Sequence, residues 1–417
     1  MVLRIEDTDR ERSTPENVGQ IIDALQWLEL DWDGEPVSQY DRRERHALAV
    51  EQLLESGRAY KDPSSGDEVR EWKAANGNRG YRGEPRDEPG AATRLRVPDD
   101  GSTVVHDLLR GDVSFPNDSQ DDFVIARGDG TPLYNLAVAV DDAEMGITDV
   151  IRGDDHLSNT PKQAMVLEAL GHEPPRYVHL PLLHGPDGKK LSKRHGAASV
   201  QELRDAGYLP EAVRNYLALL GWGTDDDTTI MSTEELVSRF DVARIGRASA
   251  IFDEQKLRWL NGRFMRELDP GEYAEMVADH LERSGVEPPS DREHFAEACR
   301  VAQDKAQTLD DVWPLIRFVF SEPVDDEKAR QKFLGPEGIE TLKAVHAALE
   351  SVPEWSAETL EEALSEVVER LEMKPGAVYQ PIRVAITGST ISPGIFDSLA
   401  LLGRDETLNR LLRVISG

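Results

Sequence analysis

The stretch Gly185-Pro-Asp-Gly-Lys-Lys-Leu-Ser-Lys-Arg-His195 directly follows an apolar, strand-like run at residues 177–183. Several cations therefore come after a glycine-rich turn at the carboxyl end of an expected strand. In an open α/β sheet, ligands bind outside this edge. The stretch thus indicates both a sheet and the edge at which its chemistry would lie.

Around this stretch, strand-like and helical segments alternate. Apolar runs at residues 134–140 and 147–151 have the character of buried segments, and Thr160-Pro-Lys-Gln163 is typical of a capped helix start. Such alternation predicts an α/β, Rossmann-like, doubly wound parallel sheet. The opening run at residues 2–5 predicts a short strand, followed by a helix that starts at Thr14-Pro-Glu16.

Two further regions differ from this alternation. Residues 61–130 are rich in Gly, Pro, Asp and Asn and carry short alternating runs, which predicts an inserted α+β module. After residue 200 the apolar spacing is helical almost throughout, which predicts all-α domains. We therefore expect five segments, with boundaries at 1–60, 61–130, 131–200, 201–267 and 268–417.

Composition limits the classes of protein. The net charge of −31 argues, taken alone, against a nucleic-acid partner, although one face can still be locally basic. The single cysteine, Cys299, excludes a disulfide framework and a zinc site built on several thiolates. Neither a membrane span nor an apolar signal core is seen, so a cytoplasmic location is the default expectation.

The cationic segment has two interpretations. Lysine ammoniums at a sheet edge could hold a triphosphate and stabilise charge on a pyrophosphate leaving group. The alternative is a solvated basic loop. The candidate nucleotide-binding residues are Lys190, Leu191, Ser192, Lys193 and Arg194.

The segment Lys190-Leu-Ser-Lys-Arg194 resembles the KMSKS motif of class I aminoacyl-tRNA synthetases. Its surroundings are similar to the bacterial-type glutamyl-tRNA synthetases in particular, and the resemblance extends over essentially the whole chain. The strings that carry it are LRIEDTDRERST from Leu3, MGITDVIRGDDHLSNTPKQ from Met145, HLPLLHGPDGKKLSKRHGAASV from His179 and FDEQKLRWLNG from Phe252.

The resemblance implies that ATP, with Mg²⁺ held mainly by its own oxygens, and glutamate form glutamyl-adenylate, from which the glutamyl group passes to tRNA(Glu). It assigns Lys193 to the ATP phosphates, with Lys190 closing the same loop. Glu6, Tyr134 and Arg152 match residues of the glutamate pocket. From the residues alone, Glu6 could be a surface or capping carboxylate and Tyr134 a core aromatic. Arg152 could equally form a structural ion pair with Asp154 or Asp155.

The resemblance also assigns the remaining segments. Residues 61–130 would grip the acceptor end of tRNA, residues 201–267 would contact its stem, and residues 268–417 would bind the anticodon. Some members of the family hold zinc in the insertion by a cysteine cluster, which this sequence lacks. We expect a monomer, and the sequence leaves open whether tRNA(Gln) is also charged.

One departure from the family concerns the HIGH tetrapeptide, which precedes the RIEDTD string in the family and occurs nowhere in this sequence. We therefore expect the doubly wound sheet to be incomplete at its N-terminal side and the activity of the chain as given to be negligible. A non-catalytic tRNA-binding derivative of such an enzyme is the alternative. An ATP-using transferase with another acceptor is a third interpretation, which the anticodon-like region disfavours.

Overall fold

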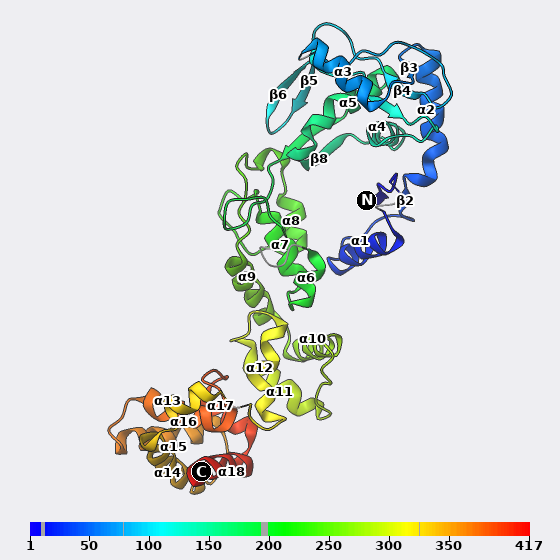
Figure 1. The fold of residues 1–417 in the computed structure, drawn as a ribbon. Coiled ribbons are helices and arrows are strands. Elements are labelled where there is room, and N and C mark those ends of the chain that lie inside the picture. Colours follow the sequence, from blue (N-terminus) through cyan, green and yellow to red (C-terminus); the bar gives the residue numbers. More distant parts are fainter. Residues whose placement is uncertain (10–12, 78, 193–198, 325) are drawn as a thin grey trace. The chain divides into compact units, whose positions relative to one another are not determined.

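The computed structural model describes residues 1–9, 13–77, 79–192, 199–324 and 326–417 (Figure 1). The chain divides into two compact units. The first comprises residues 1–196 and 217–252, and the second comprises residues 197–216 and 253–417. Each unit has hydrophobic cores of its own.

The described residues of the first unit form three sheets. A parallel pair joins β1 (Arg4–Ile5) to β2 (Val37–Ser38). An antiparallel sheet has the order β3-β4-β7, and a mixed sheet has the order β6-β5-β9-β8. In the mixed sheet β5, β9 and β8 run parallel, while β5 and β6 form the antiparallel hairpin seen in Figure 1. The strands of the last two sheets are β3 (Ala59–Asp62), β4 (Ala92–Leu95), β5 (Ser102–Asp107), β6 (Gly111–Pro116), β7 (Val124–Ala126), β8 (Asp149–Gly153) and β9 (Arg176–Leu180).

Helices cover these sheets. Some of them begin at a side-chain cap, whereas the helix at residues 160–169 begins without the side-chain cap that the sequence predicts. The Thr14 hydroxyl accepts a hydrogen bond from the backbone N–H of Asn17, so the first helix begins where the sequence predicts. A hydrophobic core unites α2, α4 and α5 with β4 and β7. The helices of this unit are α1 (Pro15–Trp27), η1 (Tyr40–Arg42), α2 (Arg43–Glu55), α3 (Gly66–Asn76), η2 (Asn117–Ser119), α4 (Tyr134–Glu144), η3 (Asp154–Asn159), α5 (Thr160–Ala169), α8 (Thr233–Arg239) and η5 (Val242–Arg244).

The predicted α/β class is confirmed, with one correction at β8. The apolar run at residues 147–151 has the character of a buried segment, but Ile147 and Ile151 are 38% and 46% exposed. Their exposure follows from the sheet order, because β8 is the edge strand of the mixed sheet among the described residues. The run at residues 134–140 forms the first two turns of α4, and its residues 136–140 are buried as expected.

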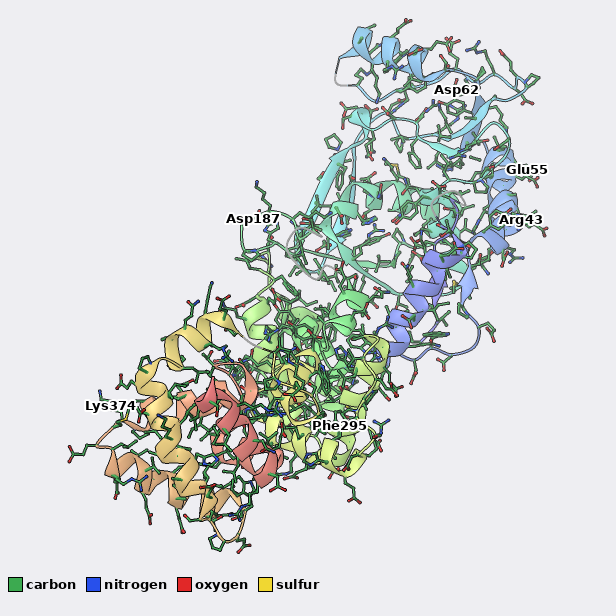
Figure 2. The ribbon with its side chains drawn as sticks, turned by 60° about the horizontal axis from the view of Figure 1, so that its bottom comes forward. Arg43, Glu55, Asp62, Asp187, Phe295 and Lys374 are labelled. Carbon is green, nitrogen blue, oxygen red and sulfur yellow. The ribbon has the colours of Figure 1, made fainter. Side chains whose placement is uncertain are left out.

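The second unit is helical throughout its described residues, as the spacing predicts. Ser199 and Glu202 form the expected capping box at its first helix. Phe295, labelled in Figure 2, is buried in the core that also contains Cys299. The helices are α6 (Val200–Asp205), α7 (Pro210–Leu219), α9 (Glu254–Glu267), α10 (Pro270–Arg283), α11 (Arg292–Gln303), η6 (Leu309–Asp311), α12 (Val312–Ile316), η7 (Arg317–Val319), α13 (Glu327–Phe333), α14 (Pro336–Glu350), α15 (Ala357–Arg370), α16 (Pro375–Thr387), α17 (Ile395–Leu402) and α18 (Arg404–Ser416).

Candidate active site

A pocket of about 340 Å³ in the first unit contains the three residues that the sequence assigns to glutamate. Glu6 follows β1, Tyr134 begins α4, and Arg152 lies on β8. Three separate elements therefore bring these side chains to one cavity. Its other lining residues are Arg4, Val138, Asp142, Ile147, Asp149, Val150, Ile151 and His156.

The pocket carries both signs of charge. Arg4 binds the Asp142 carboxylate at 2.7 Å and lies 3.5 Å from Glu6. Burial raises the pKa of Asp142, and the nearby guanidiniums of Arg4 and Arg152 only partly offset this effect. A molecule with carboxylate and ammonium groups would find a partner for each in this arrangement.

Tyr134 is half-buried and faces the same charges. Burial raises the pKa of its phenol, the Glu6 carboxylate raises it further, and Arg152 lowers it. The Tyr134 hydroxyl lies 3.5 Å from Nδ1 of His156. The phenol therefore stays protonated at neutral pH, as a hydrogen-bond donor on the pocket wall.

The alternative that Arg152 forms an ion pair with Asp154 or Asp155 is wrong. Asp154 pairs instead with Arg110, and Asp155 binds Nζ of Lys190 at 3.1 Å. The Arg152 guanidinium donates to His179 and Thr160, which are uncharged partners. The positive charge of Arg152 is thus held in place without a carboxylate bonded to it.

The basic loop lies at the same edge of the mixed sheet. A tight turn folds residues 185–190 back on themselves, with Gly188 in the left-handed region at φ 72°. Asp187, labelled in Figure 2, is exposed on this turn. The contact between Lys190 and Asp155 connects the loop to the segment that follows β8. Nucleotide chemistry and the pocket would therefore share the carboxyl edge of the parallel strands.

Of the remaining residues of the predicted nucleotide loop, the structure describes Leu191 and Ser192. Leu191 is half-buried and its backbone N–H donates to the carbonyl of Leu183, whereas Ser192 is exposed. Lys193 and Arg194 lie outside the described residues. Their assignment stays a prediction from the sequence.

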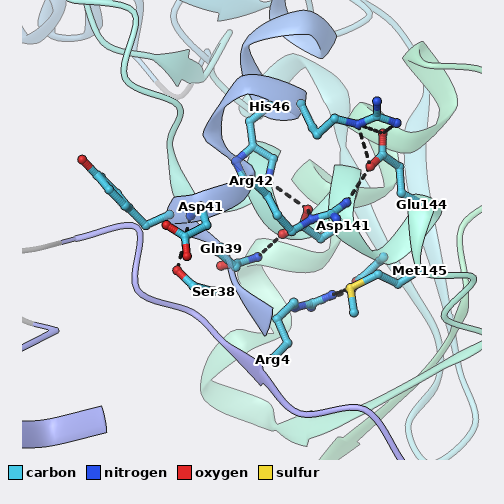
Figure 3. Close-up of polar contacts among 12 residues, drawn as sticks. Arg4, Ser38, Gln39, Asp41, Arg42, His46, Asp141, Glu144 and Met145 are labelled. Atoms are coloured by element: carbon cyan, nitrogen blue, oxygen red, sulfur yellow. Dashed lines mark hydrogen bonds and ion pairs between the residues drawn. The ribbon is translucent and has the colours of Figure 1, made fainter. Parts of the chain in front are cut away.

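Buried contacts fix the elements that carry the pocket (Figure 3). Asp141 on α4 accepts hydrogen bonds from Gln39, Arg42 and His46 at 2.8, 2.6 and 2.9 Å. These contacts attach η1 and α2 to α4, the helix that begins with Tyr134. Asp7 is 5% exposed and accepts from the backbone N–H of Tyr40, so the carboxylate beside Glu6 is a structural one.

Sequence reasoning missed four groups at this site: Arg4, Asp107, Asp142 and His179. His179 stands in the quoted string within an expected strand that leads to the basic loop, which is a positional signal that could have been used. Asp107 gives no such signal. It reaches the site only because β5 pairs with β9, and its backbone and side chain meet residues about seventy positions later.

The described part of the chain contains no group of three or more His, Cys, Asp or Glu side chains that could hold a metal ion. None of its helices has the length and apolar character needed to cross a membrane.

The sequence is similar to known protein families over most of its length. Residues 1–259 match the family of "tRNA synthetases class I (E and Q), catalytic domain", and residues 272–415 match an anticodon binding domain. The glutamate–tRNA ligase of Bradyrhizobium diazoefficiens is 44% identical over 434 residues, which cover 99% of this chain and 91% of that protein. Its counterpart from a Bradyrhizobium sp. is 45% identical over 433 residues, covering 99% and 90%.

A solved structure gives the same likeness in three dimensions. A glutamate tRNA ligase from Elizabethkingia meningosepticum, crystallised in complex with its amino acid, matches with a TM-score of 0.85 at 28% identity. The match covers 100% of this chain and 92% of that one.

Proposed function

This chain belongs to the class I tRNA synthetases of the glutamate and glutamine group, and we propose that it acts as a glutamate–tRNA ligase. ATP and L-glutamate form glutamyl-adenylate with release of pyrophosphate, and the glutamyl group then passes to the 3′ end of tRNA(Glu). The observation that carries this proposal is the pocket shared by Glu6, Tyr134 and Arg152, in a chain so similar to glutamate–tRNA ligases.

Each of these three residues has a role that its chemistry supports. The planar guanidinium of Arg152 can bond both oxygens of a substrate carboxylate. The Glu6 carboxylate, with 42% of its side chain exposed, is available to the substrate ammonium group. The phenol of Tyr134 donates a hydrogen bond that orients the bound amino acid.

The nucleotide is bound as its Mg²⁺ complex by the basic loop, residues 190–194. The ammonium groups of Lys190 and Lys193 offset the charge that develops on pyrophosphate as it leaves. The metal ion is coordinated mainly by ATP oxygens, as is usual for Mg²⁺ in nucleotide sites.

The partner is tRNA(Glu), and the segments bind it in succession. Residues 61–130 grip the acceptor end, residues 201–267 contact the stem, and residues 268–417 read the anticodon. Support comes from the match of residues 272–415 to an anticodon binding domain. The protein would work in the cytoplasm as a monomer, and tRNA(Gln) is the second acceptor to test.

We expect no structural zinc. Cys299 is the sole cysteine, and burial raises the pKa of its thiol to about 12, which disfavours the thiolate that zinc needs. Metal analysis of the purified protein should therefore find far less than one zinc per chain. Stoichiometric zinc would require a site built from His and carboxylate ligands.

The test compares two arginines on neighbouring strands. Arg152→Lys removes the two-point contact with a carboxylate and should weaken glutamate binding about tenfold or more, with little effect on ATP. Arg176→Lys is the control, since Arg176 is largely exposed and does not itself line the pocket, and a lysine there keeps the positive charge beside Asp149. Equal losses for glutamate and ATP, or equal effects of the two variants, would make Arg152 a structural residue.

A further inference from the structure

A chain of buried hydrogen bonds continues behind Arg152, away from the pocket. Nε of Arg152 donates to Nε2 of His179 at 3.2 Å. On the other side of the ring, Nδ1 of His179 lies 2.7 Å from a carboxylate oxygen of Asp107. The side chains of His179 and Asp107 are completely buried, so water does not compete for these contacts.

Asp107 fixes the protonation pattern of this histidine. Its carboxylate also accepts from the backbone N–H groups of Leu109, Arg110 and His179, at 2.9, 2.7 and 2.9 Å. Burial alone would raise the pKa of Asp107, but these donors bring it below its ordinary value. An ionised carboxylate can only accept, so Nδ1 must carry the ring proton and Nε2 presents a lone pair to Arg152.

Thr160 completes the arrangement. Its hydroxyl accepts from Nη2 of Arg152 at 2.7 Å and lies 2.9 Å from Nε2 of His179. One lone pair of the hydroxyl receives the guanidinium, and its hydrogen can point at Nε2 or at the carbonyl of His156, 3.4 Å away. Two edges of the guanidinium are thus held by acceptors, of which Nε2 depends on the tautomer that Asp107 imposes.

We propose that Asp107 and His179 are positioning residues that orient the guanidinium of Arg152 for a substrate carboxylate. This inference rests on the proposed role of Arg152 in binding glutamate. Asp107 lies at the end of β5, within the segment assigned to the acceptor end of tRNA, and β5 pairs with β9 at Tyr177. The orientation of an amino-acid-binding residue is therefore set from inside that segment.

Protonation of His179 would convert Nε2 from a hydrogen-bond acceptor for Arg152 into a donor. The charged groups that face the ring are Asp107, Arg152 and Arg110, and the ring of Tyr177 stacks on it. Burial lowers the pKa of His179 and Arg152 lowers it further, although Asp107 opposes both. The neutral ring therefore persists below the ordinary value of about 6.5. Only at more acidic pH would Nε2–H point at the guanidinium and displace it.

Two substitutions of the same residue separate positioning from simple packing. His179→Gln can place a carboxamide oxygen near Nε2 and keep an acceptor for Arg152. His179→Asn ends near Nδ1 and leaves Arg152 without that acceptor. Both variants lose the ring, so thermal unfolding gives a common baseline for damage to the core.

The readouts are the dissociation constants of L-glutamate and ATP, measured by calorimetry on the whole protein. We expect His179→Asn to weaken glutamate binding about tenfold and His179→Gln to weaken it clearly less, with ATP changed little by either. When the pH is lowered below about 6.5, the glutamate affinity of the unmodified protein should fall. The part of this fall that comes from protonation of His179 should be absent in His179→Gln. Asp107→Asn should weaken glutamate binding in the unmodified background but add little to His179→Gln.

Failure of this inference differs from failure of the proposed function. If Arg152→Lys leaves glutamate binding intact, the pocket assignment itself is wrong, and the positioning role falls with it. If Arg152→Lys weakens glutamate but the Gln and Asn variants at position 179 behave alike, His179 is a packing residue and the inference alone is overturned. Equal weakening of glutamate and ATP by His179→Asn would overturn it as well.

Discussion

At the scale of single residues, Lys193 tests the nucleotide half of the site. We expect Lys193→Ala to slow adenylate formation by about 10²-fold, the size of effect seen when a donor to the transition state is removed. Lys189→Ala is the control, because Lys189 precedes Lys193 by four residues, is exposed on the turn at residues 185–190 and lies outside the residues assigned to ATP. Single-turnover rates measure the chemical step directly. A rate unchanged in Lys193→Ala would remove this lysine from the mechanism.

The sequence could identify residues of the site that lie in recognisable motifs, but not contacts between residues far apart in the chain. The family resemblance assigned Glu6, Tyr134 and Arg152 to the glutamate pocket, and the structure brings them to one cavity. The partners of Arg152 could not be named in the same way. Asp107 and His179 meet only through pairing between distant strands, so no local pattern marks them as neighbours.

At the scale of elements, Asp141 should govern how firmly α2 is held on α4. Burial raises the pKa of Asp141, but the donors His46, Arg42 and Gln39 more than reverse this effect, so the carboxylate is ionised. Asp141→Asn removes the buried negative charge that Arg42 contacts, while Arg42 is partly exposed and keeps Glu144, so the loss in unfolding free energy should be about 2 kcal/mol. Urea unfolding, followed by a probe in the first unit, measures this loss.

A second carboxylate on α4, that of Glu144, provides the control for Asp141. Glu144 also pairs with Arg42 but is partly exposed, so Glu144→Gln should cost less than about 1 kcal/mol. Because the folded-state pKa of Asp141 is lowered, its contribution is present above about pH 4 and is lost as the pH falls through that lowered value. Similar costs for the two variants would show that Asp141 is not the anchor.

Element starts were the most predictable part of the fold. The cap at Thr14 and the capping box of Ser199 and Glu202 involve residues three apart, so the sequence displays them. The order of strands in a sheet depends on pairing between segments that are far apart in the sequence. The strands within residues 61–130 divide between two sheets, and β8 becomes an exposed edge, which neither composition nor apolar character could reveal.

At the scale of the whole molecule, the protein and its proposed partner both carry a net negative charge. The net charge is −31, yet the proposed partner is a polyanion. Local cations must then contact the phosphates, and tRNA affinity should fall about tenfold or more between about 50 and 200 mM salt. Filter binding measures this slope. Thermal unfolding at each salt concentration is the control, because screening also relieves self-repulsion in an acidic chain. An affinity independent of salt would count against tRNA as the partner.

The central claim is that this protein joins glutamate to tRNA(Glu), and charging of that tRNA tests it most directly. Although the HIGH tetrapeptide is absent, residues 1–259 match the catalytic-domain family, so purified protein, ATP with Mg²⁺, tRNA(Glu) and labelled glutamate should yield labelled tRNA. Labelled glutamine or aspartate should give about 10²-fold less. Omission of ATP should abolish the product. Binding of tRNA(Glu) without any charging would instead indicate a non-catalytic tRNA-binding protein and would contradict the account.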